Sequence, residues 1–168
     1  MANENKASKD PLTFSVQASV ARPADTNAYT ANDAVANATS SPSRLTFSGI
    51  AARETEGGTI LSVVVTSSVV AVTDVDITIL LFDEAITALE DNAAVDVSDS
   101  EIQTLVGSVS ITEEDWIVLA NNKYAVKAVS LPFVCGSSNI LDAAIRVDTA
   151  HTPASAEVYT ITLGGVRD

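Results

Sequence analysis

The sequence has very few of the residues on which most enzymes and metal proteins rely. Among its 168 residues there is one cysteine, one histidine and one tryptophan, and aromatic residues make up only 5%. The single cysteine, Cys135, excludes an intramolecular disulfide, and one cysteine with one histidine is too few for a tetrahedral zinc site. His151 lies in a turn-like His-Thr-Pro-Ala-Ser stretch, which does not indicate a Ser-His-Asp catalytic triad or a Cys-His catalytic dyad. We expect no catalytic residue, no cofactor and no metal, and we expect that the protein is not an enzyme.

Basic residues are missing from the middle of the chain. Between Glu54 and Asn122 there are fourteen Asp and Glu and no Lys or Arg, and the net charge of the whole chain is −13. Nucleic-acid binding depends on Lys and Arg that displace counterions from phosphates. We therefore expect no nucleic-acid partner, and we interpret the acidity as an aid to solubility at high local concentration.

A long hydrophobic run is also missing. The best candidate, residues 60–72, is shorter than the roughly 20 residues of a membrane-spanning helix, and Asp74 and Asp76 follow it. The N-terminus lacks the apolar segment of a signal peptide. These features predict a soluble protein that is made in a cytoplasm and has no membrane partner.

Residues that favour strands are abundant. Val, Ile and Thr together make up 49 of the 168 residues, and their branched Cβ atoms suit the pleated surface of a sheet. Apolar and polar residues alternate strictly over residues 12–20, which predicts a half-buried strand. Similar patterns predict strands at residues 45–54, 59–71, 75–82, 105–111, 116–120, 123–134, 139–148 and 157–163, with Gly57 and Gly58 forming a hairpin turn.

Strands at this spacing, without a long amphipathic helix, indicate an all-β protein. We predict an antiparallel β-sandwich of jelly-roll type, in which two packed sheets hide most strand edges. The sandwich would be a single domain spanning residues 12–168, preceded by a polar N-terminal arm at residues 1–11. Residues 83–100 are expected to form an acidic loop, and Ser98 could cap a short helical turn.

Acidic side chains offer two candidate sites. Calcium could use oxygens of the acidic loop, from Asp91, Asn92, Asp96, Asp99 and Glu101. Their spacing fits no EF-hand loop, and a solvated loop is the simpler interpretation. Paired carboxylates at residues 83–84 and 113–115 could suit a glycosidase, which normally also needs an aromatic-lined cleft. Trp116, beside the second pair, is followed by Ile-Val-Leu, so we interpret it as a core residue.

Three stretches of the chain resemble a known family. Residues 22–35 follow the pattern R-P-A-D-T-x-A-Y-x-x-x-D-x-V, residues 131–135 read Leu-Pro-Phe-Val-Cys, and residues 151–155 read His-Thr-Pro-Ala-Ser. Together they are similar to stretches of small β-proteins from the structural modules of tailed bacteriophages. The resemblance touches the front, the last third and the end of the chain, and none of these stretches is catalytic.

The resemblance implies a capsid decoration or cement protein. Such a protein would be a homotrimer on the outer surface of the virion, and it would stabilise the phage head by binding between subunits of the major capsid protein. We expect Leu80 and Phe82, on the second apolar face of the strand at residues 75–82, to be covered by a neighbouring subunit. Lys6 and Lys9 of the arm would add contacts to a neighbouring chain.

A second interpretation keeps the fold and changes the partner. The chain could be a carbohydrate-binding jelly roll of a phage tail, baseplate or head fibre. That hypothesis predicts an exposed aromatic side chain in a shallow groove, with Trp116 and Tyr29 as the candidates.

Overall fold

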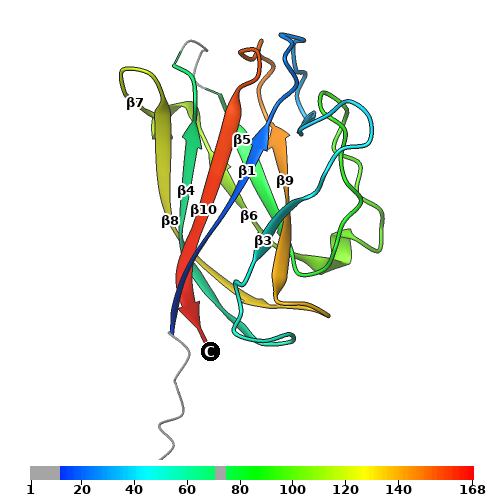
Figure 1. Cartoon of the computed structure of the whole chain (residues 1–168), viewed down its shortest axis with the longest axis vertical. Helices are drawn as coiled ribbons and strands as arrows, with labels where there is room; N and C mark the ends of the chain where they lie inside the picture. The colour runs from blue at the N-terminus through cyan, green and yellow to red at the C-terminus, as the bar shows by residue number, and fades with distance from the viewer. Residues whose placement is uncertain (1–11, 71–74) are drawn as a thin grey trace, which may run out of the picture.

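Strands that alternate between buried and exposed residues build most of this protein, as its computed structural model shows (Figure 1). The structure describes residues 12–70 and 75–168, so the predicted arm with Lys6 and Lys9 lies outside the described part. In chain order the strands are β1 (Thr13–Ala21), β2 (Ala34–Val35), β3 (Leu45–Ser48), β4 (Gly57–Ser67), β5 (Ile77–Phe82), β6 (Leu105–Ile111), β7 (Ile117–Val118), β8 (Lys123–Val134), β9 (Ile140–Val147) and β10 (Val158–Arg167). Two single 3-10 turns, η1 (Ile102–Thr104) and η2 (Glu113–Asp115), flank β6.

The strands form two antiparallel sheets. One sheet has the order β1-β10-β4-β8-β7, and the other has the order β2-β9-β5-β6, with β3 also paired to β9. Pairs formed from opposite ends of the chain are nested: β1 pairs with β10, β3 with β9, β4 with β8, and β5 with β6. This nesting is the jelly-roll pattern, so the predicted fold class is confirmed by the sheet topology itself.

The core lies between the two sheets. The alternation predicted for residues 12–20 buries Phe14 and Val20 while Ser15 and Gln17 stay exposed. On the facing sheet Ile77, Ile79 and Leu81 are fully buried. Phe14 meets Phe133 edge to face at 5.9 Å between ring centroids, closing the core at the end where the chain terminates.

Several predicted boundaries need correction. Gly57 and Gly58 were expected in a hairpin turn, but they begin β4. A Cβ on Gly57 would lie 2.2 Å from the carbonyl oxygen of Phe133, and one on Gly58 would lie 2.2 Å from that of Val166. The glycines therefore allow close approach to the strand on either side. The strand predicted at residues 45–54 ends at Ser48, because Gly49 adopts a positive φ of 69°.

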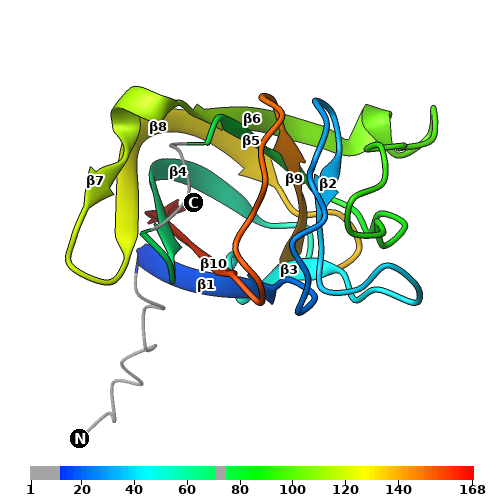
Figure 2. The ribbon, with the colours of Figure 1, turned by 90° about the horizontal axis from the view of Figure 1, so that it is seen from above.

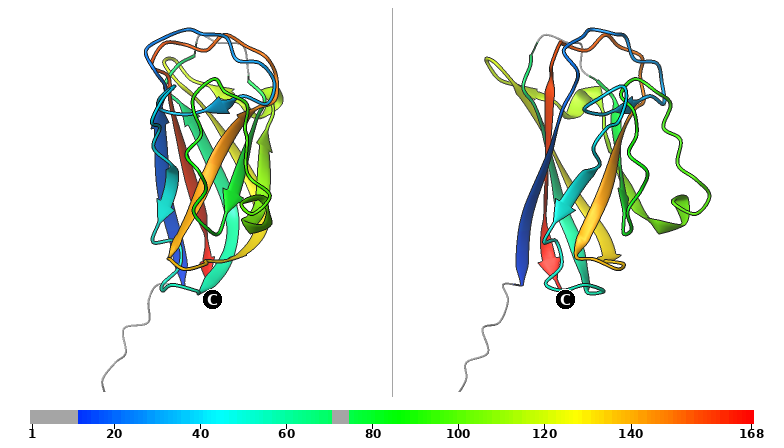
Figure 3. Two further views of the ribbon diagram at one scale, coloured as in Figure 1. Left: turned by 90° about the vertical axis from the view of Figure 1, so that its right-hand side faces the viewer. Right: turned by 45° about the vertical axis from the view of Figure 1, so that its right-hand side comes forward.

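Loops differ between the two sides of the sandwich. Figure 2 shows the loops after β2 and after β5 on the side of β9 and β2, while the β7–β8 hairpin projects at the other side. In both views of Figure 3 the loops after β1 and before β10 lie together, at the end of the sandwich opposite the C-terminus. No helix within residues 12–70 and 75–168 is long and apolar enough to cross a membrane.

Candidate functional site

Two of the three stretches that carry the family resemblance meet in space. The run at residues 22–29 leaves the end of β1, and the stretch at residues 151–155 leads into β10 (Figure 3). Tyr29 and His151 form an isolated antiparallel bridge, in which the Tyr29 N–H donates to the His151 carbonyl at 2.9 Å. The third stretch lies on β8, where Phe133 packs in the core.

Arg22 is the centre of a buried polar network at this end. Its side chain is fully buried, and its guanidinium donates to the Tyr29 hydroxyl, to Asp91 Oδ2 at 3.2 Å and to the Ala154 carbonyl at 3.0 Å. Tyr29 in turn donates its hydroxyl to Asp91 Oδ1 at 2.6 Å. The charges of Arg22 and Asp91 are thus paired and hydrogen-bonded, which burial of a charge requires.

The network holds loops together and is poorly suited to proton transfer. Burial, together with the hydrogen bond to Asp91, raises the pKa of the Tyr29 hydroxyl far above its usual range. Burial lowers the pKa of His151, whose ring lies against Tyr29 with 5.3 Å between centroids. At neutral pH Tyr29 therefore keeps its proton and His151 is neutral.

The acidic loop does not gather its carboxylates around one point. Asp91 is turned inward, where it also accepts the Ala36 N–H at 2.9 Å. Glu101 accepts from the N–H of Ser98 at 2.8 Å and from that of Thr87, and hydrogen bonds from these two residues lower its pKa to about 2. Within residues 12–70 and 75–168 no group of three or more His, Cys, Asp or Glu could hold a metal ion. Of the four loop carboxylates that we singled out for calcium, Asp91 and Glu101 thus serve as hydrogen-bond acceptors within the fold, whereas Asp96 and Asp99 are exposed.

Other candidate reactive groups also have structural partners. Cys135 is buried, and burial raises the pKa of its thiol to about 11, which disfavours the nucleophilic thiolate. Glu84 accepts from the N–H and the hydroxyl of Ser137 at 3.1 and 3.2 Å. Asp115 pairs with Lys127 at 2.7 Å and accepts from Thr112 in a capping box.

The aromatics proposed for a sugar groove are both buried. Tyr29 is 1% exposed and Trp116 is 7% exposed. The Trp116 indole N–H donates to the Val75 carbonyl at 2.9 Å, and the Lys123 ammonium lies 4.8 Å from the centroid of its ring. The expectation that one of these two side chains lines an exposed groove was wrong, because core packing uses both rings.

The loop at residues 83–100 covers the side of β5 that we expected a neighbouring subunit to cover. Phe82 is fully buried and packs with Ile86 and Ala144, while the half-buried Leu80 lies at the margin of this small cluster. Phe82 therefore has no surface to offer a partner, which corrects its assignment as a contact residue. A partner contact of Leu80 stays a prediction, as do those of Lys6 and Lys9, which lie outside the described residues.

The outer sides of the two sheets contrast. The outer side of β3, β9 and β5 carries the ion pairs Arg44–Asp142, at 2.7 Å, and Arg146–Asp148, also at 2.7 Å, in addition to the covering loop. Within residues 12–70 and 75–168, no cluster of buried residues covers the outer side of β1, β10, β4 and β8. We call it the uncharged face and define it by the outward-facing side chains of residues 15–19, 160–164, 62–66 and 124–128.

Rows of uncharged side chains cross this face at matched register. One row consists of Gln17, Thr162, Val64 and Val126, and the next consists of Ser19, Thr160, Thr66 and Tyr124. Gln17 donates to the Thr162 hydroxyl at 3.1 Å, and the Ser19 and Thr160 hydroxyls share a hydrogen bond of 2.9 Å, so both pairs point to the same side. None of the described residues that point outward from these strands carries a charge.

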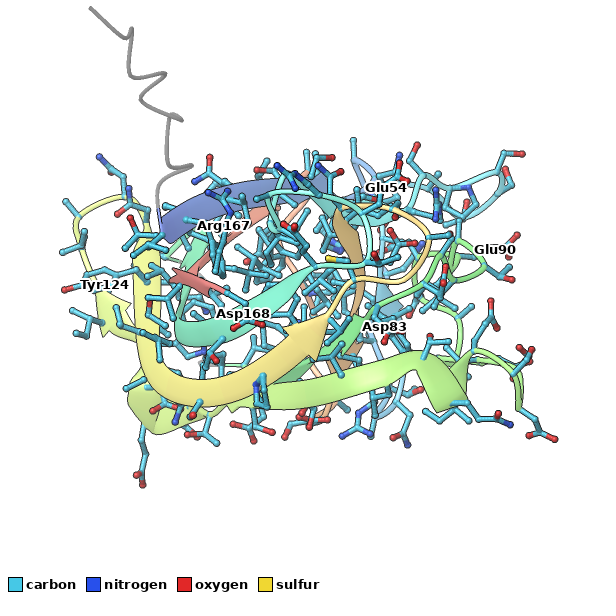
Figure 4. All side chains as sticks on the ribbon, turned by 90° about the horizontal axis from the view of Figure 1, so that it is seen from below. Glu54, Asp83, Glu90, Tyr124, Arg167 and Asp168 are labelled. Atoms are coloured by element: carbon cyan, nitrogen blue, oxygen red, sulfur yellow. The ribbon has the colours of Figure 1, made fainter. Side chains whose placement is uncertain are left out.

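Apolar side chains border the same face at the β7–β8 hairpin. Ile117 and Leu119 are each about half exposed, and Val126 is 54% exposed. Val118 pairs with the inward-facing Lys123 and therefore lies on the other side of the hairpin. A hollow of about 340 Å³ lies between the hairpin and the sheet, with Tyr124, Thr66 and Leu119 in its lining. Figure 4 shows the Tyr124 side chain pointing away from the sandwich, on the side opposite Glu54 and Glu90.

The sequence contained only part of this information. The exposed positions of β1 were visible as polar residues in alternation, but no sequence signal joined them to β10, β4 and β8. Likewise, Arg22 and Asp91 are 69 positions apart, so the pair that holds the loop end together could not be recognised from spacing.

The fold defines the class of this protein as an antiparallel jelly-roll sandwich. No family model matches the chain, and no curated protein matches it. Among solved structures, a chain of the full particle of Israeli acute paralysis virus heated to 63 degrees is 11% identical, with a TM-score of 0.31, over 99% of this chain and 80% of that one.

Two further solved structures are also of viral origin. A chain of the Human Polyomavirus 7 VP1 pentamer is 7% identical with a TM-score of 0.29, over 95% of this chain and 96% of that one. A chain of the empty capsid of Triatoma virus is 10% identical with a TM-score of 0.29, over 100% of this chain and 77% of that one. Likenesses this low carry no argument about function. The resemblance to tailed-phage proteins stays a prediction.

Proposed function

We propose that this chain is a structural protein of a tailed-phage virion, specifically a capsid decoration protein that stabilises the head by binding between major capsid subunits. The observation that carries the proposal is the asymmetry of the sandwich. One sheet is covered by the chain's own loop, whereas the described part of the chain leaves the other sheet with an uncovered face without charges. A bare, regular sheet face suits a protein whose task is to be packed against others.

The stretches that carry the family resemblance support the proposal. Arg22 and Tyr29 lie in the buried network, and Asp33 accepts from the Thr30 N–H at 2.6 Å, so this stretch shapes the loop end. The motif therefore has a structural role in this fold, and the proteins that it resembles are phage structural proteins.

The protein would stabilise the capsid through many equivalent interfaces with the capsid subunits, repeated over the capsid lattice. A specific interface buries on the order of 1,600 Å², and many equivalent contacts on one shell add avidity. The protein would be a homotrimer, made in the host cytoplasm and placed on the outer capsid surface. The net charge of −13 fits the outside of the shell, because an acidic protein is repelled by packaged DNA.

Capsids that lack the protein provide the test. We expect the purified chain to co-sediment with undecorated capsids of its own phage in saturable amounts, and to raise the temperature at which those capsids release DNA. Capsids that are already decorated are the control and should take up none. A chain that stays in the supernatant with undecorated capsids contradicts the proposal.

One observation favours the second function, a carbohydrate-binding module of a tail, baseplate or head fibre. Tyr124 borders the hollow of about 340 Å³ together with Asn122 and Thr66, which combine an aromatic ring with amide and hydroxyl groups. If this function holds, the chain binds glycans on an array and Tyr124→Ala abolishes the signal. An array without signal rejects it.

A further inference from the structure

The uncharged face stands out most clearly against the composition of the chain. Asp and Glu number 22 and the net charge is −13, yet these residues avoid the outward positions of β1, β10, β4 and β8. On the opposite sheet, by contrast, Arg146 and Asp142 face outward within one strand and are paired to Asp148 and Arg44.

An edge strand borders this face. Among the described strands β1 pairs with β10 alone, and hydrogen bonds from Arg22 N–H to the Glu157 carbonyl and from Arg167 N–H to the Leu12 carbonyl show which of its residues face that partner. The odd-numbered residues 13–21 therefore direct their peptide groups away from β10. Over these nine residues there is no charge and no proline, the devices by which exposed edges usually avoid pairing.

We propose that the uncharged face, together with Ile117 and Leu119 of the β7–β8 hairpin, is the surface on which a second copy of this chain packs. Two copies with a charge of −13 each repel one another wherever acidic side chains would meet. On this face they meet without any charged side chain between them. The inference rests on the proposed function, because it names the surface that forms the oligomer of the virion protein.

The dimensions of the face fit an interface between copies. Neighbouring strands are about 4.8 Å apart and residues about 3.3 Å apart, so the five-residue stretches that define the uncharged face span roughly 20 by 16 Å. The full nine residues of β1 and their partners on the other strands extend this footprint to roughly 20 by 30 Å. The half-exposed residues Ile117 and Leu119 extend this footprint at one end. A stable interface buries about 800 Å² on each partner, so an interface of that size would use the full length of these strands together with the hairpin.

The chemistry of the face disfavours other occupants. A nucleic acid needs Lys or Arg at the surface, and none of the described outward positions of this sheet has either. A sugar would use the hollow beside Tyr124 but would leave Val126 and the hairpin residues exposed. A second copy is the occupant that covers all of them.

The test is the mass of the full chain in solution, measured by light scattering or sedimentation over a range of concentrations. We expect wild type to exceed the 17.4 kDa of one chain, and added salt to strengthen the association by screening the repulsion between acidic copies. Thr66→Glu and Val126→Glu, which place a carboxylate on the face, should weaken the association by roughly tenfold or more, since like charges across an interface cost several kcal/mol. Thr39→Glu is the matched control, because Thr39 is exposed in the loop after β2, away from the uncharged face. Circular dichroism confirms that the variants fold.

Each outcome separates the inference from the proposed function. A wild type with the mass of one chain at every concentration overturns the inference, and so does an oligomer that Thr66→Glu and Val126→Glu leave intact. If that monomer binds glycans, the face belongs to a sugar ligand. A wild type that associates through this face but fails to bind undecorated capsids retains the inference and rejects the capsid function.

Discussion

Arg22 is a single residue that holds together three loop segments at one end of this protein. Its guanidinium connects the segment after β1 with the loop after β5 and the segment before β10, through Tyr29, Asp91 and Ala154. A buried arginine is tolerated here because a carboxylate neutralises it and hydrogen bonds satisfy it. Three loops that are far apart in the sequence are thereby held in one arrangement.

Removing the carboxylate should therefore be costly. We expect Asp91→Ala to lower the free energy of unfolding by about 3 kcal/mol, because it removes the buried partner of the Arg22 charge and leaves only the partly exposed Asp25, 3.5 Å away. Asp99→Ala, which alters an exposed carboxylate of the same loop, is the control and should have little effect. Urea unfolding followed by circular dichroism measures both. Equal effects of the two substitutions would show that the buried network does not contribute measurably to the free energy of unfolding.

His151 predicts how stability depends on pH. Burial lowers its pKa in the folded protein, so below the ordinary value of about 6.5 the unfolded chain binds a proton that the folded chain does not. The contribution of His151 is present above pH 6.5 and is lost as the pH falls through that value. We expect wild type to lose stability between about pH 7 and 5.5, and His151→Gln to lose less over the same range. Parallel curves for the two proteins would contradict this assignment.

At the level of elements, the loop at residues 83–100 covers the side of β5 that we expected a neighbouring subunit to cover. It covers β5 with Ile86 and its neighbours, so that both sides of β5 are buried within one chain. Glu101 accepts from Thr87 and Ser98, which pins the loop close to its two ends. The loop is thus a structural layer of the sandwich.

A truncation of Phe82 tests this role of the loop. We expect Phe82→Ala to lower the free energy of unfolding by about 3–5 kcal/mol even at concentrations where the chain is a single copy, since the cavity forms inside one chain. Val126→Ala, at a position 54% exposed, should have an effect within about 0.5 kcal/mol. If Phe82→Ala changes only the association of copies, a neighbouring subunit and not the loop covers β5.

At the level of the whole molecule, the distribution of charge divides the sandwich into two unlike sides. The side of β3, β9 and β5 is closed by a loop and by ion pairs such as Arg44–Asp142. The side of β1, β10, β4 and β8 is open, uncharged and bordered by apolar side chains. The molecule therefore has one face, the uncharged face, against which a partner can pack closely. The proposed functions of the chain depend on that face.

The sequence by itself determined the local structure. Alternation of apolar and polar residues predicted β6 and β8 with their correct bounds, and β-branched residues predicted an all-β sandwich. These features depend on near neighbours, because the side-chain period of two is a property of the strand alone. The boundaries failed where another strand decides the conformation, as at Gly57 and Gly58.

Only the tertiary structure decided which distant residues meet. It paired Arg22 with Asp91, turned the proposed sugar-binding aromatics Tyr29 and Trp116 inward, and covered Phe82 with the chain's own loop. It also assembled the uncharged face from four strands, none of which shows that face on its own. The physical reason is that a strand pattern shows which side is apolar but not which strand or loop covers it, since that choice depends on how the sheets pair over long separations in the chain.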